Sequence, residues 1–274
     1  MNPTPDGQSL DPGDEPRPAA FFDLDRTIIP GSSMSQFGFA AWRAGLIDPR
    51  GVAGELLRGL VFDWVGESES VADEMLPRIL ETLEGHQRSE LLELRGPLVA
   101  EMLEQARPET LRLMGLHVRM GRDCYIVSAS AIEIVEKLAD ELGFTGAIAT
   151  EAEVIDGTYT GRLAEPFRHG EEKARAIAEI ATAKNYDLSL SFAYGDSHND
   201  LPMLELVGIP IAVNPDAKLA VVAYERGWPV VQFAQPHHRA IRRLKVGAAL
   251  GTSFLAGWLG QSAFRAVAAR RTWA

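Results

Sequence analysis

Residues 19–27 read AAFFDLDRT, an apolar run that passes directly into two aspartates. Prolines precede the run and polar residues follow it, so residues 19–24 are predicted to form a buried strand of a parallel sheet. Ligands of open α/β sheets bind at the carboxyl ends of the strands. Asp23 and Asp25 therefore lie where a functional site is expected. A solvated turn or a helix cap is the alternative interpretation of the same residues.

Five other short apolar runs are predicted strands, over residues 124–129, 147–150, 190–194, 209–213 and 229–233. Helical patterns fall between them, over 132–142, 171–183, 201–206 and 218–226. Strands that alternate with helices indicate an α/β fold, here a Rossmann-like, doubly wound and mostly parallel sheet. Residues 153–163 are the exception, because Asp156-Gly157 between alternating polar and apolar residues predicts a hairpin.

The same patterns predict how the chain is divided. Residues 1–18 hold five prolines and no apolar periodicity, so a disordered leader is expected. Residues 33–120 are rich in Leu, Glu, Ala and Arg at helical spacing, which predicts a helical domain inserted after the first strand. The core domain would then comprise residues 19–32 and 121–235. Residues 236–274 are expected to form a basic, apolar helical tail.

Composition excludes several classes of protein. A chain of 274 residues, 46% hydrophobic and 24% charged, can bury a core without disulfides or structural metals. The single cysteine, Cys124, excludes an internal disulfide framework and a cysteine-based zinc site. The net charge of −11 argues against nucleic acid as the main partner. Residues 226–274 nevertheless carry eight Lys or Arg and no Asp or Glu, so the body of the chain is strongly acidic.

A second acidic motif, GDSHND at residues 195–200, directly follows the predicted strand 190–194. Asp196 and Asp200 would thus join Asp23 and Asp25 at one edge of the sheet. Several buried aspartates are costly to bring together unless a cation neutralises them. Mg²⁺ is the hard cation that accepts carboxylates together with substrate phosphate oxygens, and it is the cofactor that this pattern predicts.

Two further positions are candidate phosphate ligands. Ser128 ends a predicted strand and offers a hydroxyl, and Lys173 begins a predicted helix and offers an ammonium group. Taken singly, the serine is read equally well as a helix cap and the lysine as a solvated side chain.

The four motifs together resemble the haloacid dehalogenase superfamily. The resemblance rests on D-x-D-x-T at 23–27, Ser128, Lys173 and G-D-x-x-x-D at 195–200, in this order and on these elements, and it covers about residues 19–233. The helical insert is similar to the type 1 cap of that superfamily. The stretch from Gly195 to Leu204 is similar to the phosphoserine-phosphatase-like branch, subfamily IB.

This resemblance implies a role for each carboxylate. Asp23 would be the nucleophile that forms an aspartyl-phosphate. Asp25 would protonate the leaving oxygen and then activate water. The implied metal site comprises Asp23, Asp25 through its backbone carbonyl, and Asp196. Asp200 and Asn199 would orient the groups behind that site.

The phosphate ligands implied by the resemblance are Ser128, Lys173 and Thr27. Arg26, within the first motif, is expected to point to solvent or to the insert. The implied function is a Mg²⁺-dependent phosphatase that hydrolyses a small phosphate monoester. Two alternatives stay open: a membrane-associated phosphatase of a phospholipid-type phosphate, of the lysophosphatidate or phosphatidylglycerophosphate class, and a non-catalytic phosphate-binding or scaffold protein.

One position departs from the phosphoserine-phosphatase pattern. Those enzymes carry a Glu nine residues after the nucleophile that binds the substrate amine, and here that position is Ser32. We therefore expect L-phosphoserine to be a poor substrate.

The tail admits more than one interpretation. Residues 246–264 carry no charge and are flanked by basic residues. A helix there could dock on the body of the protein or on another subunit, or lie on an anionic membrane surface. The contact would involve residues 239–271. The expected location is cytoplasmic, with attachment to the inner face of the membrane as the alternative.

Overall fold

The computed structural model describes residues 15–43 and 69–233. All of these except Phe233 belong to one compact unit. The expected leader lies almost wholly outside the described residues, and the expected tail, with its proposed contacts over 239–271, lies entirely outside them. Within the described residues, no helix combines the length and the apolar character that crossing a membrane requires.

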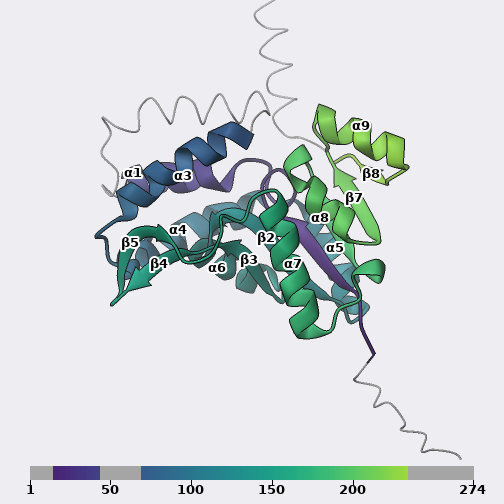
Figure 1. Ribbon diagram of the computed structural model, residues 1–274, viewed down its shortest axis with the longest axis horizontal. Helices are drawn as coiled ribbons and strands as arrows, with labels where there is room; N and C mark the ends of the chain where they lie inside the picture. The colour runs from purple at the N-terminus through teal and green to yellow at the C-terminus, as the bar shows by residue number, and fades with distance from the viewer. Residues whose placement is uncertain (1–14, 44–68, 234–274) are drawn as a thin grey trace, which may run out of the picture. The chain divides into compact units, whose positions relative to one another are not determined.

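A six-stranded sheet forms the centre of this unit (Figure 1). Its spatial order is β3-β2-β1-β6-β7-β8, and every neighbouring pair is parallel. The strands are β1 (Ala19–Asp23), β2 (Asp123–Ala131), β3 (Gly146–Thr150), β6 (Phe192–Gly195), β7 (Ile209–Val213) and β8 (Val230–Val231). The predicted Rossmann-like α/β fold is confirmed, with β1 between β2 and β6 at the point where the strand order reverses.

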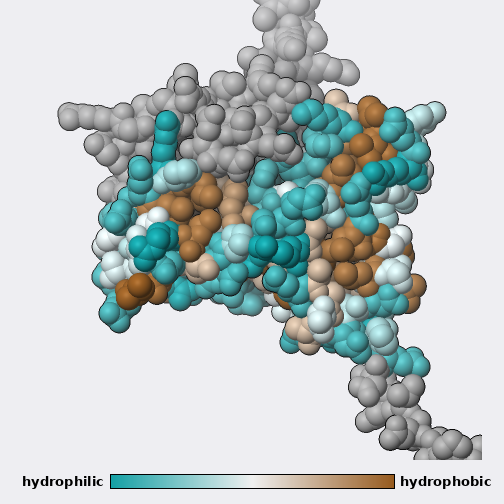
Figure 2. Space-filling model, in the orientation of Figure 1, coloured by the Kyte–Doolittle hydropathy of each residue, from teal (hydrophilic) through white to brown (hydrophobic). Residues whose placement is uncertain are grey.

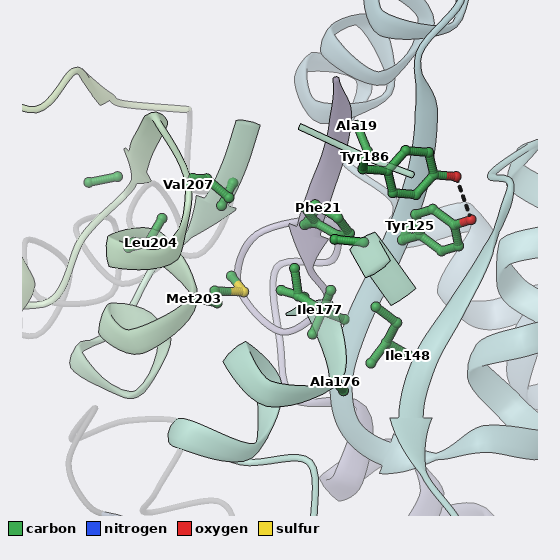
Figure 3. Packing of buried hydrophobic residues seen from close by; sticks show 14 of the residues in the cluster. Ala19, Phe21, Tyr125, Ile148, Ala176, Ile177, Tyr186, Met203, Leu204 and Val207 are labelled. Carbon is green, nitrogen blue, oxygen red and sulfur yellow. Dashed lines mark hydrogen bonds between the residues drawn. The ribbon is translucent and has the colours of Figure 1, made fainter. Parts of the chain in front are cut away.

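Helices cover both faces of the sheet, which explains why β1 is buried along its whole length. The core helices are α5 (Pro108–Arg119), α6 (Ile132–Leu142), α7 (Glu171–Lys184), α8 (Leu201–Leu206) and α9 (Ala217–Arg226). Because side chains alternate along a strand, Phe21 and Phe22 serve opposite faces. Phe21 packs with Ile177 of α7 and Met203 of α8 (Figure 3). Phe22 stacks on Tyr194 and meets the edge of His117 from α5.

His117 is a buried neutral side chain on that second face. Its Nδ1 accepts from Arg122 at 3.3 Å, so its proton resides on Nε2, 2.8 Å from the Tyr194 hydroxyl. Burial, together with the nearby Arg122 charge, lowers the pKa of His117 to about 4. The unfolded chain, with a pKa of about 6.5, therefore binds more protons than the folded protein between pH 6.5 and 4.

We expect this difference to destabilise the protein in acid. Stability from His117 is present above pH 6.5 and is lost as the pH falls toward 4, by roughly 3 kcal/mol. Urea unfolding at pH 7 and pH 4 should show a larger loss for the wild type than for His117→Gln, which cannot titrate. Equal losses in the two proteins would contradict a buried neutral histidine.

The described part of the segment between β1 and β2 consists mainly of helices. It contains α1 (Ser33–Arg43), α3 (Glu69–Leu83) and α4 (Arg88–Gln105), followed by α5. Helix α4 packs on α1 and on α6, whereas α5 packs on β1 and β2. Thr110 of α5 donates to the backbone oxygen of Thr27 at 2.8 Å. The expected insert, 33–120, thus includes one helix that lies directly on the sheet.

The predicted hairpin is also present, as β4 (Ala152–Ile155) and β5 (Thr158–Leu163). Asp156 and Gly157 both have positive φ, 50° and 80°, which is what a two-residue turn of this type requires. The hairpin contacts the turn between α3 and α4: the Tyr159 N–H donates to His86 at 2.9 Å and its carbonyl accepts from Gly85 at 3.0 Å. Backbone hydrogen bonds therefore join the helical insert to the core.

Candidate active site

The candidate site lies at the carboxyl ends of β1, β2 and β6. Asp23 is the last residue of β1, Ser128 lies on β2, and Asp196 directly follows β6. Because all three strands are parallel and adjacent, their ends share one edge of the sheet. Asp23, Ser128 and Asp196 are each less than 5% exposed. The topology thus gathers residues that are up to 173 positions apart in the sequence.

Lys173 lies between two of the aspartates. Its Nζ donates to Oδ1 of Asp23 at 2.6 Å and to Oδ1 of Asp200 at 2.7 Å. The lysine is 5% exposed and occupies the first turn of α7. Burial alone would lower the pKa of Lys173, but the Asp200 and Asp23 carboxylates outweigh it and raise that pKa. Lys173 is therefore a fixed positive charge beside Asp23.

Asp200 is fixed by the loop that carries it. Its Oδ2 accepts from the N–H groups of Asp196 and Ser197, at 3.1 and 3.2 Å, and lies 3.3 Å from the Ser197 hydroxyl. A Cβ on Gly195 would lie 2.6 Å from the Asp200 Cβ, so this arrangement requires glycine. Asn199 lies in the same short 3₁₀ turn and is half-buried. The spacing in GDSHND therefore lets the Asp200 carboxylate accept hydrogen bonds from the N–H groups of its own loop.

Asp23, Asp196 and Asp200 form a buried carboxylate cluster. Each offers one oxygen, and these oxygens all lie within 4.8 Å of one another. Burial raises the pKa of Asp23 to about 8, with the Asp200 charge adding to the rise and Lys173 opposing it. Burial also raises the pKa of Asp196, although Arg26 opposes this. The side chain of Asp25 is outside the cluster.

The donor set of this cluster fits a divalent cation. Oδ2 of Asp23 is buried and receives no hydrogen bond from any residue that the structure describes. Two cationic groups, Lys173 and Arg26, accompany the three carboxylates, so the cluster would hold one negative charge in excess with all three carboxylates ionised. Ionised carboxylate oxygens are ligands for hard cations, and a bound cation would favour the ionised forms of these three aspartates.

Arg26 lies in this site, and the expectation that it points to solvent or to the insert is wrong. Its Nε lies 2.7 Å from Oδ2 of Asp196, and its φ of 60° is in the left-handed region. The turn after β1 holds this conformation with a hydrogen bond from the Arg26 N–H to Gly31 at 3.2 Å. The unusual backbone turns the side chain toward the acidic loop, which the sequence pattern does not reveal.

Asp25 lies at the start of a chain of contacts toward the helical insert. Its Oδ1 accepts from the N–H of Ser33, at 2.7 Å, in the first turn of α1. The hydroxyls of Ser33 and Ser130 lie 2.5 Å apart, and the Ser130 N–H donates to Ser128 Oγ at 3.1 Å. Burial raises the pKa of Asp25, although the Ser33 hydrogen bonds oppose the rise. A raised pKa favours the protonated form of this carboxyl, which is the form that an acid requires.

Two other positions complete the site. Thr27 is fully buried, and its Oγ1 has no hydrogen-bond partner among the described residues. Ser32 is also buried, and its Oγ accepts from the N–H of Ser35 at 3.3 Å, in the first turn of α1. Position 32 therefore carries no charge, and its hydroxyl caps a helix.

Comparison with known proteins gives consistent results. Residues 20–205 match the model of the haloacid dehalogenase-like hydrolases. The chain is 35% identical to phosphoserine phosphatase SerB1 of Mycobacterium tuberculosis over 249 residues, covering 90% of this chain and 80% of that protein. It is 30% identical to a histidinol-phosphatase of Neisseria meningitidis, covering 78% of this chain and 98% of that protein.

A solved structure has a similar fold. A Bordetella pertussis protein of unknown function superposes with a TM-score of 0.68 at 28% identity, covering 79% of this chain and 98% of that one. The family match spans most of the chain and includes all four motifs. The chain therefore belongs to the haloacid dehalogenase-like hydrolases, and within them it is a phosphomonoester phosphatase of the phosphoserine-phosphatase-like kind.

Proposed function

We propose that this protein hydrolyses a small phosphate monoester with Mg²⁺ as cofactor and an aspartyl-phosphate on Asp23 as intermediate. The observation that carries the proposal is the state of Asp23. One of its oxygens is held by Lys173 at 2.6 Å, and the other is buried without a partner in the described residues. A fixed carboxylate with one free oxygen is the arrangement that a nucleophile requires.

The first half-reaction breaks the substrate's phosphorus–oxygen bond. The free oxygen of Asp23 attacks phosphorus in line with the leaving oxygen, and the bonding electrons pass to that oxygen. Asp25 gives it a proton, so the product is an alcohol. Lys173, with the hydroxyls of Ser128 and Thr27, would hold the phosphoryl oxygens and balance their charge.

The second half-reaction returns the enzyme to its starting state. Asp25, now a carboxylate, takes a proton from water as the water oxygen attacks the phosphorus of the aspartyl-phosphate. The bond to Asp23 breaks, and inorganic phosphate leaves. Asp25 then holds its proton again, so protons balance over the cycle. The hydrogen bond from Ser33 keeps this carboxyl in place throughout.

The Mg²⁺ ion would be held by Asp196, by the backbone carbonyl of Asp25 and by the Asp23 oxygen that does not attack phosphorus. When bound, such a cation neutralises the carboxylates and draws charge from the phosphoryl oxygens. Asp200 is committed to Lys173 and to the loop N–H groups, so its proposed role is to position them. Asn199 would support the same loop. Arg26 would have to give up its contact with Asp196 or share it.

The proposal predicts both activity and cation binding. Purified protein should release phosphate from p-nitrophenyl phosphate with Mg²⁺ and lose this activity in EDTA, while Ca²⁺ should support it poorly. At a Mg²⁺ concentration a hundred times its Kd, the melting temperature should rise by about 5 to 10 °C.

Asp196→Asn should remove most of both effects, because it deletes a proposed ligand. Asp140→Asn, a matched change at an exposed position of α6, is the control and should behave like the wild type. Full phosphate release after dialysis against EDTA would refute the metal requirement. Absence of turnover with every phosphate ester tested, in the presence of Mg²⁺, would refute the function itself.

A further inference from the structure

We propose that the group attached to the substrate's phosphate is apolar and uncharged, and that it binds in a pocket between the helical insert and the β4–β5 hairpin. This inference rests on the proposed function and deepens it by naming the class of leaving group. The class is a phosphate monoester of a short aliphatic or aromatic alcohol. Substrates with an ammonium group near the phosphate are disfavoured.

The pocket has a volume of about 50 Å³, and residues of the helical insert, of the core and of the hairpin line it. Its apolar walls include Phe37 of α1, Leu76 and Leu80 of α3, Leu91 of α4, Leu163 of β5, and Phe167. Hydrophobic residues are also visible on the surface between α3 and the hairpin (Figure 2). A site with such walls gains affinity by removing apolar surface of a ligand from water.

This pocket adjoins residues that contact the reacting groups. Ala129, Ser130 and Ala131 form one side of it, and they directly follow Ser128, the proposed phosphate ligand. The Ser130 hydroxyl contacts that of Ser33, whose N–H is held by Asp25. The pocket therefore begins on the Asp25 side of the site. Because Asp25 is the proposed proton donor to the leaving oxygen, the leaving group lies on that side.

The charges around the pocket exclude an ammonium ligand. Among the lining residues that the structure describes, Glu133 is the only charged one. Its Oε1 already accepts from Arg88 Nε at 3.0 Å and from the Tyr159 hydroxyl at 3.1 Å, and the residue is 2% exposed. Arg88 thus neutralises this carboxylate. A cation buried here would lack a counter-charge of its own, which is strongly unfavourable.

A series of alkyl phosphates tests the inference on the wild-type protein. Ethyl, butyl and hexyl phosphate have leaving groups of nearly equal basicity, so chemistry alone predicts equal rates. With an apolar pocket, kcat/KM should rise about threefold to fourfold per added methylene until the pocket is filled. O-phosphoethanolamine matches propyl phosphate in size, and its kcat/KM should be at least about tenfold lower than that of propyl phosphate.

A variant of the wall provides the second test. Leu80→Glu places a carboxylate in the pocket and should flatten the dependence on chain length while raising the relative rate with O-phosphoethanolamine. Leu116→Glu, the same change at a position of α5 that is 46% exposed, is the matched control and should keep the wild-type ratios. Circular dichroism and thermal unfolding report whether each variant is folded.

The outcomes separate the inference from the function on which it rests. If no phosphate ester is hydrolysed, the proposed function fails. If all esters are hydrolysed but the rate is independent of chain length, or if L-phosphoserine or O-phosphoethanolamine is preferred, the apolar pocket is overturned while the phosphatase stands. The wild-type series decides this even if Leu80→Glu does not fold.

Discussion

Asp23→Asn should reduce phosphate release by at least about 10³-fold with every substrate. An amide cannot replace the attacking carboxylate, and no other carboxylate of the site is free to do so. Asp200 is held by Lys173 and by the loop N–H groups, and Asp196 by Arg26. The measurement is kcat/KM for p-nitrophenyl phosphate at saturating Mg²⁺.

The same variant should fold at least as well as the wild type without metal. Burial and the Asp200 charge raise the pKa of Asp23, which means that its ionised form is costly in the folded protein. Asn has the same shape without the charge, and Lys173 keeps its contact with Asp200. Urea unfolding in EDTA should show no loss of stability.

Retention of more than a tenth of the wild-type rate would refute Asp23 as nucleophile.

Much of the fold could be predicted because its signals are local. Residues 19–22 are apolar on both faces, as a strand between two layers of helices must be, and the structure buries them together with Asp23. The Asp156-Gly157 turn is equally local, since it depends on two residues that accept positive φ. Parallel pairing then brings Asp23 and Asp196 to one edge without any knowledge of side-chain packing.

Other features of the site depend on contacts that no local pattern encodes. The Arg26 side chain meets Asp196 because the turn after β1 adopts a left-handed conformation at a residue that rarely does so. Ser33 and Ser130 are 97 positions apart and meet only after the helical insert has packed on the core. Sequence spacing places residues on elements, but it does not determine how two elements turn toward each other.

The apolar pocket escaped prediction for the same reason. Its leucines on α3 look like ordinary core residues of an amphipathic helix, and hydrophobic periodicity cannot distinguish a residue that lines a pocket from one in a packed interior. What distinguishes them is where α3 ends relative to the hairpin. That is set by backbone hydrogen bonds between Tyr159 and the turn at residues 85–86.

Asp25→Asn should separate the two half-reactions. Asn keeps an oxygen that can accept from the Ser33 N–H, so the site should stay in place, but it can neither give nor take the proton. Alkyl phosphates require that proton, and their turnover should fall by about 10² to 10⁴-fold. The p-nitrophenolate ion leaves without a proton, so the first half-reaction with p-nitrophenyl phosphate should be affected much less.

Hydrolysis of the aspartyl-phosphate still needs Asp25 as base, so the variant should stall after one turnover. Rapid mixing with p-nitrophenyl phosphate should then give a burst of about one nitrophenolate per active site, followed by a slow phase. The protein recovered after the burst should be heavier by one phosphoryl group in its intact mass, and Asp23→Asn should show neither burst nor mass gain.

If Asp25→Asn hydrolyses hexyl phosphate as fast as the wild type, Asp25 is excluded as the acid. A slow phase without a burst would place the lost proton transfer before the intermediate, and the two-step role of Asp25 would be wrong.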